Sequence, residues 1–173
     1  MAAPKSSAGM TLIELLMVVA VIVIIAAVAL PSITMTISNM HLSAAANSLA
    51  GTLQAARYQA ISDGCAYEVI VTASSNSLLV ETETNQSAPT TTTACNTTFT
   101  PVIATYPLGG VQQFASSEVI LNATQTVMFN PSGTVSTTSN VNIPTGFTFV
   151  FSLPNVSQTK TLTISGVGNV RIQ

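Results

Sequence analysis

The most regular feature of the chain is an apolar run without charge, residues 15–30, which directly follows Glu14. A helix from Met10 to Leu30 is about 30 Å long at about 1.5 Å per residue, and this is the thickness of the hydrocarbon core of a bilayer. We therefore predict a membrane-spanning helix over residues 10–31.

The residues ahead of this span, 1–9, are polar and carry one charge, Lys5. A basic residue on that side favours a cytoplasmic amino terminus, so the rest of the chain should face outward. A cleaved secretory signal has a similar layout, and Ala27-Val28-Ala29 would serve as its cleavage site. Glu14 argues against that alternative, because an acid at the mouth of the apolar region has no use in a signal that is discarded.

Beyond Pro31 the pattern predicts an amphipathic continuation of the helix over residues 32–64. Pro31 lacks an amide hydrogen and should kink the helix where it leaves the membrane. Asp63 and Gly64 should end the helix, with Gly64 in a left-handed conformation. Five apolar residues recur on one face of a 3.6-residue period: Leu42, Leu49, Leu53, Ala56 and Ala60.

From Cys65 onward the pattern alternates between apolar and polar positions, which is typical of strands. Runs 67–71 and 78–80 flank Ser74–Ser77 and predict a hairpin. Residues 65–173 therefore predict a β-rich domain, and the chain an α+β fold in which one or two antiparallel sheets lie on the carboxyl half of the helix. Residues 86–98 predict a polar surface loop. Further strands are expected at 119–121, 126–129, 147–151, 161–164 and 170–172.

The composition gives little support to an enzyme. The 173 residues are 47% hydrophobic and only 6% charged, far below the roughly 25% charge of soluble domains. The one histidine, His41, has no Cys or acid at catalytic spacing, and we see no nucleophile elbow, phosphate-binding glycine loop or metal-binding pair. We predict no enzymatic activity, no cofactor and no metal, although a calcium site built from backbone oxygens stays open.

The amino-terminal pattern of Gly9, an apolar Met10, Thr11-Leu12-Ile13-Glu14, an apolar stretch and Pro31 resembles the class III signal of type IV pilins and type II secretion pseudopilins. The resemblance implies that a prepilin peptidase cuts after Gly9 and methylates the amine of Met10. The usual first mature residue of that family is phenylalanine, so Met10 departs in side chain and not in apolar character.

The same resemblance gives Glu14 a role. An acid inside a membrane helix is costly and is a functional hypothesis by default. In a filament, Glu14 of one subunit can lie beside the charged amine of Met10 of a neighbour, and each charge then neutralises the other. The alternative is an interfacial acid without a partner.

The remainder of the chain is similar, more loosely, to the H-type pseudopilins of type II secretion and to the FimT and FimU minor pilins. The similar segments are 53–61, the turn 129–133 and the closing strands 162–172. The resemblance implies the pilin fold, a single-pass inner-membrane protein with a periplasmic domain, and a structural role in a pseudopilus or pilus. The implied partners are other pilin subunits, the prepilin peptidase, the inner-membrane assembly platform and membrane lipid.

Two cysteines, Cys65 and Cys95, lie beyond the span, in a compartment where disulfides form and persist. We expect them to pair. The alternative is a reactive thiol or a metal pair, and it has no nearby His, Cys or clustered carboxylate to complete a site.

Some FimT-like minor pilins take part in DNA uptake through basic residues near the carboxyl terminus, and a tip-located DNA-uptake or adhesion subunit is the alternative function. At the matching place this chain has Arg171, with Lys160 nearby, on an acidic chain. Because phosphate contacts supply most non-specific affinity, we expect weak DNA contact at best and do not count nucleic acid as a partner. Residues 83–87 also match an acceptor pattern for bacterial N-glycosylation, a short motif that arises by chance in such chains.

Overall fold

The computed structural model describes residues 10–83, 95, 98–102, 108–137, 146–154 and 156–173, without the side chains of 28–32 and 156. The chain divides into two compact units, Met1–Ile37 and Ser38–Gln173. The helix contributes to both.

One long helix, α1, runs from Leu12 to Asp63. Its carboxyl end agrees with the prediction, since Gly64 follows at a φ of 67°. This left-handed conformation is open to glycine without steric cost and stops the helix.

The second unit contains the predicted apolar face of α1. All five residues that were predicted to share that face are at most 1% exposed. Three alanines widen the buried face, and small side chains there let the sheets approach the helix closely. The buried residues of α1 are Leu42, Ala45, Ala46, Leu49, Ala50, Leu53, Ala56 and Ala60.

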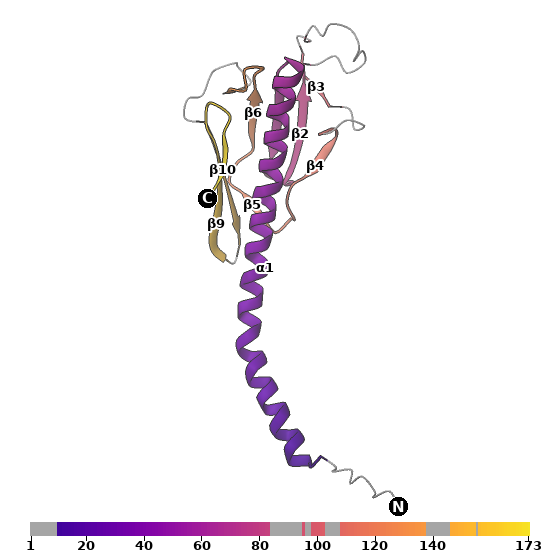
Figure 1. Ribbon diagram of the computed structural model, residues 1–173, viewed down its shortest axis with the longest axis vertical. Helices are drawn as coiled ribbons and strands as arrows, with labels where there is room; N and C mark the ends of the chain where they lie inside the picture. Colours follow the sequence, from indigo (N-terminus) through magenta and orange to yellow (C-terminus); the bar gives the residue numbers. More distant parts are fainter. Residues whose placement is uncertain (1–9, 84–94, 96–97, 103–107, 138–145, 155) are drawn as a thin grey trace, which may run out of the picture. The chain divides into compact units, whose positions relative to one another are not determined.

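Two antiparallel sheets pack against this half of the helix (Figure 1). The first sheet has the order β3-β2-β1-β6-β7, and β4 also pairs with β2. Its strands are β1 (Tyr67–Thr72), β2 (Ser77–Thr82), β3 (Thr100–Pro101), β4 (Val111–Gln113), β6 (Gln125–Phe129) and β7 (Val135–Ser136). The second sheet has the order β10-β9-β8-β5. Its strands are β5 (Ile120–Leu121), β8 (Phe147–Leu153), β9 (Val156–Ile164) and β10 (Val170–Ile172).

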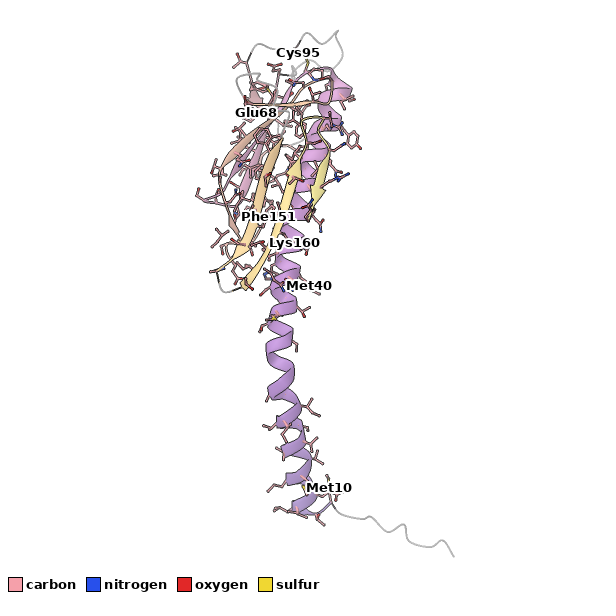
Figure 2. The ribbon with its side chains drawn as sticks, turned by 90° about the vertical axis from the view of Figure 1, so that its left-hand side faces the viewer. Met10, Met40, Glu68, Cys95, Phe151 and Lys160 are labelled. Atoms are coloured by element: carbon pink, nitrogen blue, oxygen red, sulfur yellow. A yellow bond between two sulfur atoms is a disulfide. The ribbon has the colours of Figure 1, made fainter. Side chains whose placement is uncertain are left out.

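The core lies between the helix and the inner faces of the two sheets. Alternate residues along each strand point inward, as the period-2 pattern predicts. Phe114 and Phe151 meet edge to face with ring centroids 6.2 Å apart, and Figure 2 shows Phe151 on the second sheet. The core strands contribute Val69, Val71, Leu78, Val80, Val127, Phe129, Phe149, Phe151, Leu162 and Ile164.

A buried asparagine holds a loop to the first hairpin. Asn76 sits in the β1–β2 turn at a φ of 48° and is 5% exposed. Its Nδ2 donates to the carbonyl oxygens of Ser116 and Val119, at 2.8 and 2.6 Å, and the backbone carbonyl of Asn76 accepts from the amide of Phe114 at 3.1 Å. The turn therefore fixes the segment that leads into β5.

The sequence predicted both strands of the first hairpin and the later runs, and the prediction of antiparallel sheets is confirmed. Three short strands, β3, β4 and β7, were not predicted, and β9 begins at Val156 rather than at residue 161. The predicted loop 86–98 and the glycosylation pattern 83–87 lie almost entirely outside the described residues.

Candidate functional site

The amino-terminal motif forms the cap of α1. The Thr11 carbonyl accepts from the amides of Glu14 and Leu15 at 3.1 and 3.2 Å, and its Oγ1 accepts from the Glu14 amide at 3.3 Å. Thr11 is therefore the residue before the first helical turn, and Glu14 stands three positions later. Threonine and glutamate at this spacing form the pattern of a capping box. Sequence reasoning missed this second use of Thr11 and Glu14.

The Glu14 carboxylate lies in the first turn of α1 and is exposed. A helix amino terminus carries a partial positive charge, so an acid in the first turn is favoured there. The pairing of Glu14 with the amine of Met10 in a neighbouring subunit stays a prediction.

The first unit exposes apolar side chains on every side of its helix. The exposed fractions include 81% at Leu12, 64% at Ile13 and 66% at Ile24. A helix that is apolar all round is normally covered by lipid or by protein. In the described part of the chain, no helix combines the length and the apolar character that a membrane crossing requires.

Three further residues of the amino-terminal prediction are Lys5, Gly9 and Pro31. Gly9, the predicted cleavage position, and Lys5 lie outside the described residues. Pro31 lies within α1, and its side chain is outside the description. Cleavage after Gly9, methylation at Met10 and a kink at Pro31 therefore stay predictions.

Arg57 joins three segments that lie far apart in the sequence. From the exposed flank of α1, its Nε donates to the carbonyl oxygen of Gly133 at 3.0 Å. A terminal nitrogen of the same guanidinium donates to the carbonyl oxygen of Val167 at 2.9 Å. The helix is thus tied both to the β6–β7 turn and to the β9–β10 turn.

The two turns that receive Arg57 also contact each other closely. A side-chain carbon added at Gly168 would lie 2.4 Å from the Gly133 carbonyl oxygen and 2.6 Å from the Arg57 Nε, so only glycine fits there. The amide of Val135 donates to the carbonyl of Gly166 at 2.9 Å, which links the two sheets directly.

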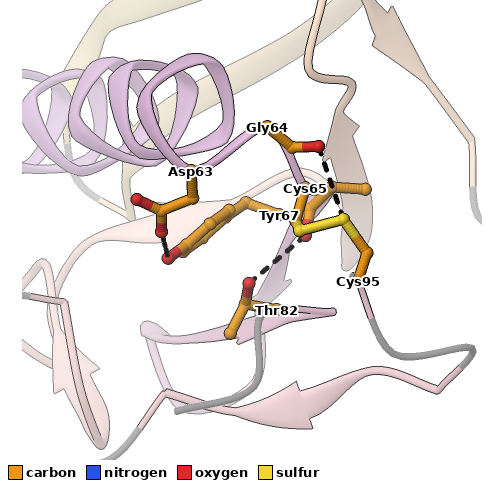
Figure 3. The surroundings of a disulfide bond; sticks show 7 residues. Asp63, Gly64, Cys65, Tyr67, Thr82 and Cys95 are labelled. Carbon is orange, nitrogen blue, oxygen red and sulfur yellow. Dashed lines mark hydrogen bonds between the residues drawn. A yellow bond between two sulfur atoms is a disulfide. The ribbon is translucent and has the colours of Figure 1, made fainter. Parts of the chain in front are cut away.

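The predicted disulfide between Cys65 and Cys95 is present, with the two Cα atoms 5.5 Å apart. Figure 3 shows it at the carboxyl end of α1, where the Tyr67 hydroxyl also donates to the Asp63 carboxylate at 2.6 Å. The Cys95 sulfur lies 3.4 Å from the Gly64 carbonyl oxygen, a contact and not a donated hydrogen bond, because a disulfide sulfur carries no proton. The bond ties residue 95 to the end of the helix.

Two carboxylates face each other on the side of the first sheet that points away from α1. Glu68 of β1 pairs with Glu81 of β2 in the register, and Glu68 is only 7% exposed. Burial, and after it the charge of Glu81, raises the pKa of Glu68 above its ordinary value of 4.5. Like charges directly opposite each other on neighbouring strands destabilise a sheet.

The remaining candidates are separate from these groups. His41 Nδ1 lies 3.6 Å from the Glu118 carboxylate, and both side chains are exposed. Lys160 is half-buried on β9, and Arg171 is exposed on β10. Among the residues described, no three His, Cys, Asp or Glu side chains come together in a way that could hold a metal ion.

Comparison with known proteins identifies two parts of the chain. Residues 45–168 match the family model described as Type II transport protein GspH. Residues 4–30 match the model described as the prokaryotic N-terminal methylation motif. No curated protein sequence matches the chain.

Two solved structures have a similar fold. The minor pseudopilin EpsH of the Type 2 Secretion System of Vibrio cholerae has a TM-score of 0.56 and 14% identity, over 77% of this chain and 96% of that chain. The type IV minor pilin FimU of Pseudomonas aeruginosa has a TM-score of 0.52 and 20% identity, over 78% of this chain and 90% of that chain.

A helix packed on antiparallel sheets, preceded by a methylation motif, defines a protein of the pilin fold. Because the family model covers more than half of the sequence, the chain belongs to the type II transport protein GspH family. Its fold is that of the minor pseudopilin EpsH and the minor pilin FimU, and the family is one of structural subunits and not of enzymes.

Proposed function

We propose that this chain is an inner-membrane-anchored subunit that joins and helps to initiate a type II secretion pseudopilus or a type IV pilus, and so serves protein secretion. In this proposal the prepilin peptidase cuts after Gly9 and methylates the amine of Met10. The inner-membrane assembly platform then moves the subunit from lipid into contact with other pilin subunits.

The observation that carries the proposal is the amino-terminal motif, which matches the methylation model over residues 4–30 and has Glu14 exposed in the first turn of the helix. Exposed apolar side chains from Leu12 to Ile25 need a cover of lipid before assembly and of other subunits afterwards. A carboxylate in that setting is neutralised when the charged amine of a neighbour's Met10 lies beside it.

The test compares two variants at Glu14 with the wild type for membrane insertion and for recovery in sheared filaments. Glu14→Gln keeps the side chain that a capping box uses and removes the charge, whereas Glu14→Ala removes both. If Glu14 pairs with an amine, both variants insert normally and both are depleted from filaments, because breaking a buried ion pair costs about 3 to 5 kcal/mol.

Glu118→Gln is the matched control, since Glu118 is an exposed acid on the second unit. Recovery of Glu14→Gln at the wild-type level, with Glu14→Ala depleted, would show that capping and not charge is the role of Glu14. Mass spectrometry of the mature protein tests the processing step independently, and the expected amino terminus is N-methylated Met10.

The DNA-uptake or adhesion alternative has less support. Arg171 is exposed and Lys160 is half-buried, and six acidic residues outnumber the basic ones. Gel-shift of the full chain with DNA at low salt tests this alternative, and we expect no micromolar complex.

A further inference from the structure

The three basic side chains of the described residues lie along one seam between α1 and the edge of the second sheet. Arg57 and Arg171 line an open pocket of about 300 Å³ together with Gln54, Tyr58 and residues 168–170. Lys160 lines a second pocket of about 380 Å³ whose other wall is Asn39, Leu42 and Ser43 of the same helix. Figure 2 shows Lys160 on the sheet edge near the helix.

None of these three cations is neutralised within the described part of the chain, where the ion pair present is His41 with Glu118. The carboxylates Glu68 and Glu81 are on the other side of the first sheet, turned away from α1. In a chain with 6% charged residues, the seam is therefore a distinct positive strip.

The sheet edge that borders the seam has unpaired backbone groups. Thr161 and Gln173 exchange two hydrogen bonds, at 3.0 and 2.8 Å, and the Ser165 amide donates to the Asn169 carbonyl at 2.9 Å. Hydrogen-bonded pairs alternate along an antiparallel ladder. Arg171 therefore bonds to β9, whereas the amides and carbonyls of Val170 and Ile172 point away from it. In the described residues, β9 is the one strand that pairs with β10.

Apolar side chains flank the same edge. Tyr58 is 67% exposed, Val167 in the β9–β10 turn is 59% exposed, and Ile172 of β10 is 36% exposed. Between the two pockets the helix flank carries Gly51, which has open space around it. The rise from Ser43 to Gln54 separates the pockets by about 17 Å, the length of about five extended residues.

We propose that this seam binds an extended, acidic segment of another protein, which adds a strand to β10. Addition of a strand satisfies the open amides and carbonyls of Val170 and Ile172, and this mode of recognition takes its affinity from the main chain. Carboxylates of the added strand meet Arg171 and Lys160, and its alternate small apolar side chains meet Tyr58 and Ile172. The proposal goes beyond filament entry and does not depend on the role of Glu14.

A protein segment fits these observations better than nucleic acid does. The open amides and carbonyls alternate along the strand edge and match the main chain of a peptide. Three cations spread along the seam of an acidic chain are few for a phosphate backbone. Nucleic acid is therefore an outcome of the test that would overturn the proposal.

The experiment measures amide hydrogen exchange by NMR on the full chain in detergent micelles, with three probes. The first is the capped peptide Thr-Glu-Val-Glu-Val-Thr, the second is its counterpart with Lys in place of Glu, and the third is a single-stranded hexanucleotide. We expect the acidic peptide to bind below about 1 mM and to slow exchange at Val170 and Ile172. The Arg171 amide, which already bonds to β9, serves as the internal control and should not change.

Two pairs of variants separate the backbone from the charge. Ile172→Pro removes an edge amide without breaking the ladder to β9 and should weaken binding about tenfold, whereas Ile172→Ala keeps the amide and most of the affinity. Arg171→Gln should weaken binding by several-fold and Arg171→Lys by less. Equal binding of the two peptides, no binding of the acidic peptide, or binding of the hexanucleotide alone would overturn the proposal.

Discussion

At the scale of single residues, Arg57 makes long-range hydrogen bonds that its position in the sequence does not predict. Its two carbonyl partners lie 76 and 110 residues away in the chain. A sequence pattern places Arg57 on the polar flank of the helix, but it does not say which turns come to that flank. The nearest signal is that segments 53–61, 129–133 and 162–172 all resemble the same family, and these three segments meet at Arg57.

We predict that Arg57→Met lowers the free energy of unfolding by about 1 to 3 kcal/mol. The stem of the side chain is kept, but the carbonyls of Gly133 and Val167 lose their charged donor. Urea unfolding of the full chain in micelles, followed by circular dichroism, measures the change. Arg171→Met is the control, and because Arg171 is exposed its effect should stay within about 0.5 kcal/mol. Equal stability of both variants would remove the structural role assigned to Arg57.

Glu68 predicts a dependence of stability on pH. Its pKa is raised above 4.5 in the folded chain, first by burial and then by Glu81, so the folded state holds this proton more tightly than the unfolded state. The free energy of unfolding therefore falls as pH rises from the unfolded pKa through the folded pKa. Glu68→Gln should remove this fall and be more stable than the wild type at pH 7.

Thermal unfolding of the wild type and Glu68→Gln between pH 4 and pH 7 tests this expectation. The two curves should approach each other at the acidic end, where Glu68 is protonated in both states. A wild type that gains stability relative to Glu68→Gln as pH rises would contradict the sign.

At the scale of elements, Gly146 has no room for a side chain, whereas Gly51 has open space around it. A side-chain carbon at Gly146, which precedes β8 at a φ of 73°, would lie 1.6 Å from the Ile164 carbonyl oxygen. Gly51 lies within α1 and has nothing within 4 Å of that position. We predict that Gly146→Ala destabilises the chain by more than about 2 kcal/mol, and that Gly51→Ala stabilises it by about 0.5 to 1 kcal/mol. Melting temperatures of the two variants, taken side by side, check both signs.

The sequence alone predicted the elements whose buried residues recur with a regular period. The helix face from Leu42 to Ala60 and the longer strands follow from periods of 3.6 and 2. Strands β3, β4 and β7 have two or three residues each, too few for an alternation to be visible, and they form because a longer neighbour supplies the ladder. The first half of β9 was missed because Ser157–Thr159 is polar and exposed. The Thr11 cap was not predicted because the apolar pattern includes Met10 and does not mark Leu12 as the first helical residue.

At the scale of the whole molecule, the disulfide closes a loop of 30 residues between the end of α1 and residue 95. In the chain-entropy account such a loop stabilises the folded state by roughly 3 to 4 kcal/mol. We predict that the double variant Cys65→Ser and Cys95→Ser lowers the free energy of unfolding by roughly 3 to 4 kcal/mol. The urea concentration at the midpoint of unfolding should fall with it. Addition of a reductant to the wild type should have the same effect and should leave the double variant unchanged. Sensitivity of the double variant to reductant would show that another process is being measured.

The buried face of α1 also decides how the second unit bears tension. In this unit strands β2, β6 and β9 run in roughly the same direction as the helix (Figure 1), and the contacts from Leu42 to Ala60 are distributed along it. A pull along the helix axis therefore loads these contacts in shear, all together, rather than peeling them apart one turn at a time. Arg57 and the disulfide hold the far end of the same interface. A pull at the start of this unit therefore has to break the contacts from Leu42 to Ala60 together before the sheets separate from the helix.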